Sequence, residues 1–331
     1  MKPLVTVVIP NFNCGNYLTR CLDSIFSQAV NFDFNVIVVD DGSTDDSLTV
    51  LSQYEHSSDL TIIKQSNSGV SSARNAGIEN AQGSYITFVD ADDTLCEGSL
   101  QLMVDNINDS DFISYSYQNI KTDSSVVIQH QIDGTYSGKT FHDNLFFFAN
   151  RIVFAPHAKL ISHEFLQNSN VRFPQDISTG EDFIFCMKLF TKANKFTIVD
   201  SPVYNYCENS SSVTHQFSYD LWKNQSRMIQ EVYSLNPPDS KYELEFIVKR
   251  MLGVYKTYFP VCGKTETIDI LNKYWTSCYG DKYISCHSGR FLYKIPIYLC
   301  VHNSFSLVVS YFSVIDSLLR LKHLFLRRIS K

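Results

Sequence analysis

The chain has 331 residues, which is too many for one small domain and enough for a full hydrophobic core with an extension. Hydrophobic residues make up 44% of the sequence and charged residues 19%, and the formal net charge of −6 argues against a nucleic-acid-binding protein. The nine cysteines include no C-x-x-C pair, which argues against a structural zinc site and a disulfide framework and indicates a reducing compartment.

The N-terminal residues do not have the pattern of a targeting segment. A short apolar run at residues 4–9 is interrupted by Asn11 and Asn13, too early for a signal peptide, and no small-residue cleavage site follows. No stretch reaches about 18 uninterrupted apolar residues, the length that a membrane-spanning helix needs. We therefore expect a cytoplasmic protein without a transmembrane helix.

Four apolar, β-branched runs predict strands that are buried on both faces of a parallel sheet. They occupy residues 4–9, 36–39, 60–64 and 85–89. The apolar residues between these runs recur at helical spacing, which predicts helices over residues 16–28, after residue 44 and over residues 68–83. This alternation predicts an α/β fold with a doubly wound, mostly parallel sheet, in which ligands bind at the carboxyl ends of the strands.

Polar residues follow three of these predicted strands. Asn11 ends the first strand, Asp40 and Asp41 end the second, and the sequence Asp-Ala-Asp-Asp at residues 90–93 follows the fourth. Because these strand ends meet at one edge of the sheet, they predict one shared site. The three carboxylates of residues 90–93 are expensive to bury unpaired, so they need full solvation, a cationic side chain or a divalent metal. We interpret them as a strand end that holds a metal ion and, through it, a diphosphate.

After residue 93 the alternation of strands and helices becomes irregular. The further strands that we expect occupy residues 112–117, 126–132, 196–199 and 203–206, and the further helices occupy residues 100–107, 141–149 and 180–190. From about residue 217 only helical spacing remains, over residues 242–259, 265–274, 292–299 and 307–326. The pattern therefore predicts an α/β domain over residues 1–216 and a mainly helical region over residues 217–331.

Several motifs resemble those of family-2 glycosyltransferases with the GT-A fold, the fold of nucleotide-diphospho-sugar transferases. They lie at residues 7–13 (VVIPNFN), 21–28 (CLDSIFSQ), 38–45 (VVDDGSTD), 67–77 (NSGVSSARNAG, for G-x-x-x-A-R-N-x-G), 90–93 (DADD, for D-x-D) and 180–183 (GEDF, for the E-D motif). Their order and spacing are similar to those of the family, and they cover about residues 4–215. Residues 217–331 match no family pattern.

The resemblance implies an enzyme that transfers a sugar from a nucleotide-diphosphate donor, with a UDP-sugar favoured, to an acceptor hydroxyl. Transfer would invert the anomeric carbon and use Mn²⁺ or Mg²⁺. The family resemblance further implies a hexosyl- or N-acetylhexosaminyltransferase of bacterial surface polysaccharide synthesis (capsule, O-antigen or exopolysaccharide), acting on a glycan or lipid-linked glycan acceptor. Residues 1–93 would be the nucleotide-binding half and residues 94–216 the acceptor-side half.

Two alternatives to an active glycosyltransferase remain. One is a catalytically silent relative that acts as a binding or scaffold subunit. The other is a nucleotidyltransferase, which should carry a glycine-rich basic loop after its first strand. Residues 10–15 (PNFNCG) contain no lysine or arginine, which disfavours this second alternative.

The D-x-D resemblance assigns roles to residues 90–93. Asp92 would bind the metal, which would bridge it to the diphosphate and stabilise the charge of the departing nucleotide. Asp90 would contact the donor ribose or a metal-bound water, and Ala91 completes the motif between them. Asp93 would either assist or cap the helix that follows near Glu97. The competing interpretation of this motif alone is a solvated acidic turn.

The resemblance places the nucleotide base at the neighbouring strand ends. Asp41 would accept a hydrogen bond from N3–H of the base, and the competing interpretation is a helix-capping turn. Pro10 and Asn13 would shape the base pocket through their backbone geometry. Arg74 would hold the base or the phosphates, and the competing interpretation is a salt bridge to Asp40 or Asp41.

Asp182 is the candidate general base. Inverting transfer needs a carboxylate that takes the acceptor's proton as its oxygen attacks the anomeric carbon. This base must face the donor sugar across the acceptor, so it should come from a different part of the chain than the D-x-D motif, as Asp182 does. Glu181 is the second candidate, or it positions the acceptor. The competing interpretation is a pair of acids that stabilise the first turn of a helix.

Three further features each have two interpretations. His215 would be a third metal ligand or a phosphate contact, although a lone histidine is more often neither. Lys159 lies in a stretch that resembles the family's W-x-K-L motif, with Pro156 and His157 in place of the usual tryptophan, and is at least as consistent with a structural role. The basic segment after residue 306 would lie on an anionic membrane surface, or pack on the catalytic domain or on a second subunit of a homo-oligomer.

Overall fold

The computed structural model describes residues 2–54, 57–121, 124–128, 132–177, 179–208, 221–235, 242–279, 291–302 and 304–329. The chain divides into two compact units. The first comprises Met1–Asp143 and Arg151–Gln216, and the second comprises Asn144–Asn150 and Phe217–Lys331. The division after residue 216 lies where the strand pattern of the sequence ends, whereas nothing in the sequence separates residues 144–150 from their neighbours.

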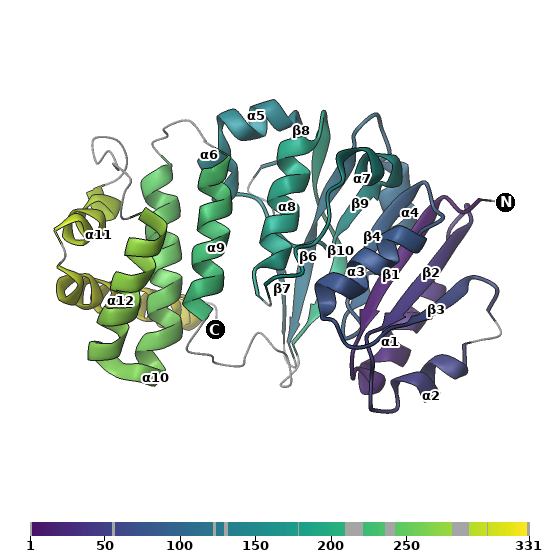
Figure 1. Cartoon of the computed structure of the whole chain (residues 1–331), viewed down its shortest axis with the longest axis horizontal. Coiled ribbons are helices and arrows are strands. Elements are labelled where there is room, and N and C mark those ends of the chain that lie inside the picture. The colour runs from purple at the N-terminus through teal and green to yellow at the C-terminus, as the bar shows by residue number, and fades with distance from the viewer. Residues whose placement is uncertain are drawn as a thin grey trace. The chain divides into compact units, whose positions relative to one another are not determined.

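The first unit is built on one sheet, most of whose strands are labelled in Figure 1. They are β1 (Val5–Asn11), β2 (Phe34–Asp40), β3 (Leu60–Lys64), β4 (Tyr85–Phe88), β5 (Thr94–Leu95), β6 (Phe112–Lys121), β7 (Ser124–Ile128), β8 (Gly134–Tyr136), β9 (Lys159–Ser162) and β10 (Phe196–Cys207). They pair in the order β3-β2-β1-β4-β9-β6-β10-β5, with β7 beside β6 and β8 beside β10.

The predicted α/β fold is confirmed, but the sheet is mixed rather than mostly parallel across its whole width. The four N-terminal strands β1 to β4 pair in parallel, as do β6 and β10. In contrast, β9 runs antiparallel between β4 and β6. β9 was not predicted, and the two short strands expected at residues 196–206 form the single strand β10, whose register is irregular around Pro202.

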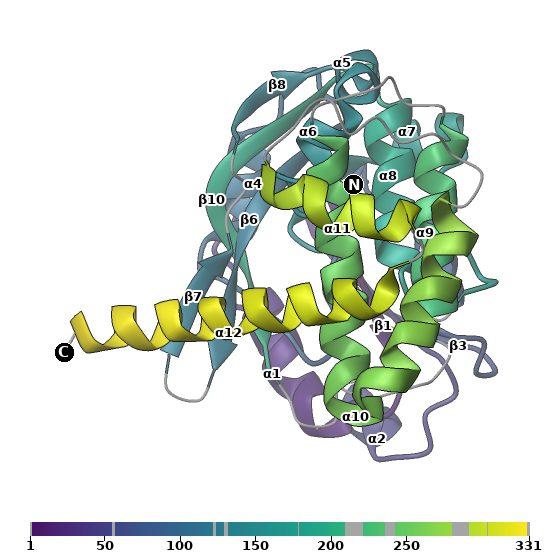
Figure 2. The same ribbon diagram turned by 90° about the vertical axis from the view of Figure 1, so that its left-hand side faces the viewer.

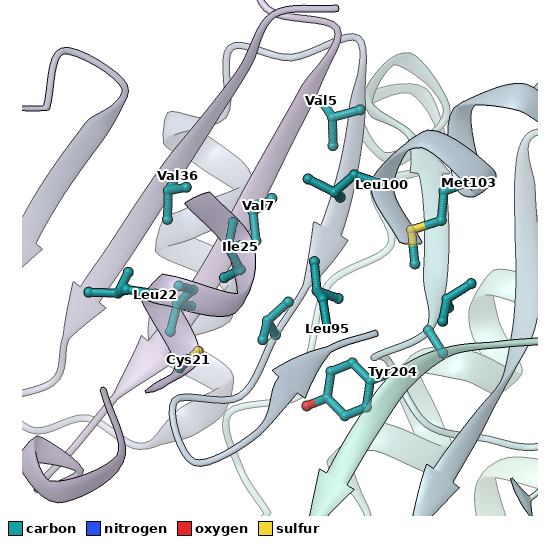
Figure 3. Close-up of a cluster of buried hydrophobic side chains, with 14 of the residues drawn as sticks. Val5, Val7, Cys21, Leu22, Ile25, Val36, Leu95, Leu100, Met103 and Tyr204 are labelled. Atoms are coloured by element: carbon teal, nitrogen blue, oxygen red, sulfur yellow. The ribbon is translucent and has the colours of Figure 1, made fainter. Parts of the chain in front are cut away.

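The helices of the first unit are α1 (Gly15–Phe26), α2 (Ser47–Ser52), α3 (Val70–Asn80), α4 (Ser99–Asp105), α5 (Gly138–Asp143), α7 (His163–Ser169) and α8 (Glu181–Lys192). Helices cover both faces of β1, which explains its continuous apolar sequence. On one face, Val7 belongs to the buried cluster that contains Ile25 of α1 (Figure 3). On the other, Val8 lies so close to Gly77 of α3 that an added Cβ atom would be 2.2 Å from Val8 Cγ1. Polar residues are therefore confined to the ends of β1.

The second unit is helical (Figure 2). Its helices are α6 (Leu145–Ala149), α9 (Leu221–Ser234), α10 (Glu243–Tyr279), α11 (Phe291–Val301) and α12 (Phe305–Ile329). Phe146 of α6 packs against Tyr233 of α9 and Phe246 of α10, which ties residues 144–150 to this unit. α10 consists of two helices that meet at a kink, where Gly263 is non-helical (φ 73°), so the two helices expected over residues 242–259 and 265–274 are confirmed. None of the helices in the described ranges is long and apolar enough to cross a membrane.

Candidate active site

The first part of the candidate site is the rim at the carboxyl ends of β1 and β2. Asn11 and Asp40 end these strands in register, and the Asn11 side chain donates to Asp40 Oδ1 over 2.8 Å. Asp40 also accepts a hydrogen bond from the backbone N–H of Ser43, at 3.3 Å. Asp40 is therefore a structural residue that joins the two strand ends.

Asp41 organises the loop between β3 and α3. The side chain is buried, and its Oδ1 accepts hydrogen bonds from Gln65 Nε2 at 2.7 Å and from the Ser68 N–H at 2.8 Å. Its Oδ2 accepts one from the Gly69 N–H at 2.8 Å. The carboxylate does not cap α2, so the helix-capping alternative is wrong. A carboxylate oxygen can accept two hydrogen bonds, so Oδ2 retains the capacity to accept one from a ligand.

Asn13 joins the loops that follow β1 and β2. Its backbone is in the left-handed region (φ 53°), which asparagine tolerates better than most residues. Its side-chain Oδ1 accepts hydrogen bonds from the N–H groups of Thr44 at 2.8 Å and Asp45 at 3.3 Å. Pro10 lies within β1, paired with Val39 of β2. The backbone around both residues is thus firmly held, and their contact with a nucleotide base remains a prediction.

The second part of the candidate site is the turn at residues 90–93, which is attached to β10. Tyr204 of β10 accepts a hydrogen bond from the Asp90 N–H at 3.1 Å and donates its hydroxyl to Asp93 Oδ2 at 2.5 Å. Asp93 Oδ1 accepts from the Cys207 N–H at 2.7 Å. Burial, together with the charge of Asp90, raises the pKa of Asp93 to about 8. Asp93 therefore anchors the turn, and the prediction that it caps the next helix is wrong, since α4 begins at Ser99 after Gly98.

Asp92 is the residue of this turn that fits a metal ligand. Its side chain is half-buried, whereas Ala91 is buried in the core and can face the site only through its backbone. Mg²⁺ is commonly bound by one or two carboxylates together with substrate phosphates, and carboxylate oxygens also suit Mn²⁺. In the part of the chain that the structure describes, no three His, Cys, Asp or Glu side chains form a metal cluster, so the remaining ligands would have to come from the donor and from solvent. His215, the other predicted ligand, lies outside the described residues.

Arg74 lies between the two acidic motifs. Its guanidinium is almost fully buried, and it contacts Asp90 Oδ1 through Nη2 at 2.8 Å and Asp182 Oδ1 through Nη1 at 2.6 Å. Glu181 is farther away, with Oε1 at 3.9 Å from Nη1. The predicted alternative, a salt bridge to the acids at the end of β2, is therefore wrong. Instead, one guanidinium brings the D-x-D motif and the E-D motif together.

The two acids of the E-D motif open α8, as the sequence predicts. Gly180 precedes the helix in a left-handed conformation (φ 95°), and both acids lie in the first turn. Burial raises the pKa of Asp182, and the adjacent Arg74 acts in the opposite direction. Burial and the charge of Asp182 raise the pKa of Glu181 to about 7. For Asp90, burial also opposes the charged form, but Arg74 holds its pKa below the usual value.

Asp90, Arg74, Glu181 and Asp182 form an acidic cluster. Two residues that adjoin this cluster were not predicted as site residues. The imidazole of His157 stacks on Tyr204 at a ring-centroid distance of 4.3 Å, and its Nδ1 lies 4.0 Å from Asp90 Oδ2. The only sequence signal for His157 is its place in the W-x-K-L-like stretch, and Tyr204 is one of 19 tyrosines. Lys159 of the same stretch is buried, and its Nζ donates to the Ala155 carbonyl at 2.5 Å, which is a structural contact.

Comparisons with known proteins agree with this geometry. The family model described as glycosyl transferase family 2 matches residues 6–169. The chain is 29% identical over 226 residues to EpsJ of Bacillus subtilis, an uncharacterized glycosyltransferase, covering 65% of this chain and 64% of EpsJ. It is 34% identical over 280 residues to the glycosyltransferase GlyA of Streptococcus pneumoniae, covering 80% of this chain and 39% of GlyA. The chain thus spans less than two thirds of the length of these two relatives.

A solved structure has the same fold over nearly the whole chain. The crystal structure of residues 1–349 of TarS from Staphylococcus aureus, in complex with UDP-GlcNAc, matches with a TM-score of 0.72 at 19% identity, and the match covers 96% of this chain and 92% of that one. The fold likeness therefore extends into residues 217–331, for which the sequence matched no family pattern. With the family match and the acidic motifs in the family's order, the chain belongs to glycosyltransferase family 2 and has the GT-A fold.

Proposed function

We propose that this chain is a metal-dependent, inverting glycosyltransferase that moves a hexosyl or N-acetylhexosaminyl group from a nucleotide-diphosphate sugar, with a UDP-sugar favoured, to an acceptor hydroxyl. The observation that carries the proposal is the pairing of Asp90 and Asp182 through Arg74. This pairing supports the proposal because it would let a donor-side carboxylate and the candidate base act on one substrate. The UDP-GlcNAc complex of the TarS structure supports the choice of donor.

On the donor side, we assign the nucleotide to the rim and the diphosphate to the turn at residues 90–93. Asp41 has one acceptor position left on Oδ2, which suits the N3–H of a base. Asp92 would hold Mn²⁺ or Mg²⁺, which supplies charge stabilisation to the departing nucleotide diphosphate. Asp90, held by Arg74, would contact the donor ribose or a metal-bound water.

On the acceptor side, we assign the general base to Asp182. Its carboxylate would take the proton of the acceptor hydroxyl while the acceptor oxygen attacks the anomeric carbon from the face opposite the leaving diphosphate. Burial raises the pKa of Asp182, which makes it a stronger base than an exposed aspartate, while Arg74 opposes this rise and fixes the orientation of the carboxylate. Glu181, which is only weakly paired with Arg74, would accept a hydrogen bond from the acceptor or donate one to it.

The relatives point to bacterial polysaccharide synthesis as the setting. The relatives include a protein named as a poly(ribitol-phosphate) β-glucosyltransferase and another named as a poly(ribitol-phosphate) β-N-acetylglucosaminyltransferase. We therefore propose a glycan or lipid-linked glycan as the acceptor. The basic sequence at the C-terminus supports a membrane-surface contact, and the exposed Tyr298 and Leu307 of the second unit would suit that contact or one with a second copy of the chain.

The test is donor binding and slow donor hydrolysis by the purified full chain. A panel of UDP-, GDP- and dTDP-sugars is screened by thermal shift with Mn²⁺, with Mg²⁺ and with EDTA, since a bound ligand raises the melting temperature by mass action. We expect one donor class to bind in a metal-dependent way and to release its nucleotide diphosphate slowly. If no nucleotide sugar binds or is hydrolysed with any metal, the chain is a silent relative instead.

A further inference from the structure

His157 is a buried histidine whose two ring nitrogens form no hydrogen bond with any described residue. The residue is 8% exposed, and neither ring nitrogen has a hydrogen-bond partner within the described residues. Buried polar atoms are paired in the great majority of cases, so two unpaired nitrogens on one side chain call for an explanation. Burial lowers the pKa of His157 to about 3, so the ring is neutral at physiological pH and carries one N–H group to donate.

The unpaired ring is directed at the D-x-D turn. It stacks on Tyr204, whose hydroxyl holds both ends of that turn, and it makes a T-shaped contact with the ring of Tyr117, with ring centroids 4.9 Å apart. The carboxylate oxygen Asp90 Oδ2 lies 4.0 Å from Nδ1. This distance exceeds an ordinary N–H···O hydrogen bond by only about 1 Å.

The backbone next to His157 is held in an unfavourable conformation. Ala158 has a φ of 54°, in the left-handed region that residues other than glycine and asparagine seldom occupy. Its carbonyl accepts a hydrogen bond from the Tyr115 N–H at 2.8 Å, which anchors this conformation. Such strain persists only where the surrounding structure imposes it, and it is concentrated at functional sites. Here it fixes the position from which the His157 ring extends.

We propose that His157 is a positioning residue for Asp90, and that its Nδ1–H donates to Asp90 Oδ2 when the donor is bound. Arg74 already holds Oδ1, so a second partner on Oδ2 fixes the plane of the carboxylate. A shift of about 1 Å in the Asp90 side chain, which is 26% exposed, is enough to form the bond. The inference rests on the proposed function, because it gives Asp90 a role in donor binding.

A double-mutant cycle separates this role from simple packing, because residues that act through one another have non-additive effects. His157→Phe keeps a ring between Tyr204 and Tyr117 but removes both nitrogens. Its dissociation constant for the nucleotide sugar in Mn²⁺ is compared with that of the wild type, of Asp90→Asn and of the double variant. We expect His157→Phe to weaken donor binding about tenfold, as for a hydrogen bond to a charged group, but less than about twofold when it is combined with Asp90→Asn.

Two further variants complete the test. His157→Asn keeps a donor near the Nδ1 position and should retain donor affinity within about threefold of the wild type. His163→Phe, the same change at a histidine that contacts the Gly83 carbonyl, is the matched control and should bind donor normally. If the Phe variant does not fold, His157→Asn and His157→Leu give the same comparison, since only the former can donate.

Each result has a distinct meaning. Equal losses with and without the Asp90→Asn change, or no loss in either background, would overturn the positioning role of His157 while leaving the glycosyltransferase proposal intact. Failure of the wild type to bind any nucleotide sugar would instead refute the proposed function itself. A tenfold effect that disappears in the Asp90→Asn background supports both.

Discussion

The two parts of the candidate site hold their carboxylates in different ways. At the rim, Asp41 accepts three hydrogen bonds from uncharged amide groups, all within 28 residues of it in the sequence. In the acidic cluster, one buried cation, Arg74, pairs with Asp90 and with Asp182, which is 108 residues away. The rim is thus a product of neighbouring loops, whereas the cluster forms only when distant parts of the first unit come together.

This difference predicts that the rim and the cluster have different functions. Carboxylates held by neutral amides keep one orientation and suit a constant task, such as recognition of a base. Carboxylates that share one guanidinium respond to each other's charge, which suits proton transfer. We therefore expect substitutions of Arg74 and Asp182 in the cluster to change transfer more than nucleotide affinity, and substitution of Asp41 at the rim to do the reverse.

The largest effect is expected for Asp182→Asn. The amide cannot accept a proton, so sugar transfer should fall about a thousandfold, while the dissociation constant for the nucleotide sugar stays within about twofold. Steady-state kinetics and donor titration measure the two effects separately. Asp105→Asn, at an exposed acid of α4 that accepts a hydrogen bond from Gln101, is the control. Weakened donor binding with normal turnover would contradict the assignment of the base.

Arg74→Lys tests the link between the two motifs. A lysine carries the charge but cannot hold two carboxylates with two separate nitrogens in a fixed plane. We expect transfer to fall about 10- to 100-fold with UDP affinity nearly unchanged. Arg172→Lys, at an arginine that contacts nearby oxygen atoms of residues 166–171, is the matched control. A parallel loss of UDP affinity would show that Arg74 holds the nucleotide, as the motif first implied.

Glu181→Gln should change how stability depends on pH. The pKa of Glu181 is raised to about 7 in the folded state, so the folded protein holds the proton more tightly than the unfolded chain does. The contribution of Glu181 to the free energy of unfolding is therefore fully present below its unfolded pKa, and it is lost as the pH rises through about 7. The Gln variant does not titrate, so its stability relative to the wild type should increase between pH 5 and pH 8, by on the order of 2 kcal/mol. Urea unfolding at both pH values measures this. Glu164→Gln, at an exposed acid of α7, is the control.

The smallest effect is expected at the rim. Asp41 uses both carboxylate oxygens to accept hydrogen bonds from three donors, and one of these oxygens is proposed to accept another from the base. Asp41→Asn has only one accepting oxygen, so nucleotide affinity should fall about tenfold. The loss should be equal for UDP and for the UDP-sugar, with turnover at saturation unchanged, because the sugar lies elsewhere. Asp59→Asn, at an exposed acid before β3, is the control. A selective loss for the UDP-sugar would place Asp41 in the sugar site and remove the distinction between rim and cluster.

The sequence by itself was enough for the local features of this protein. The mainly apolar, β-branched runs predicted β1 and β2 correctly, because strands covered on both faces carry few polar residues. The positions of the acidic motifs at strand ends and in the first turn of α8 were also predictable, since they depend on sequence spacing and on the geometry of parallel sheets. These features identified the family before any contact was known.

Only the tertiary structure decided which of these residues act on one another. Arg74 pairs with Asp182 rather than with the acids at the end of β2, which are closer to it in the sequence. Asp93 accepts a hydrogen bond from Tyr204, 111 residues later, and does not cap the next helix. The approach of His157 to Asp90 depends on β9, whose four residues carry no distinct pattern. The physical reason is that a buried charge takes whichever partner the packed core brings within about 3 Å, and sequence spacing does not determine that distance.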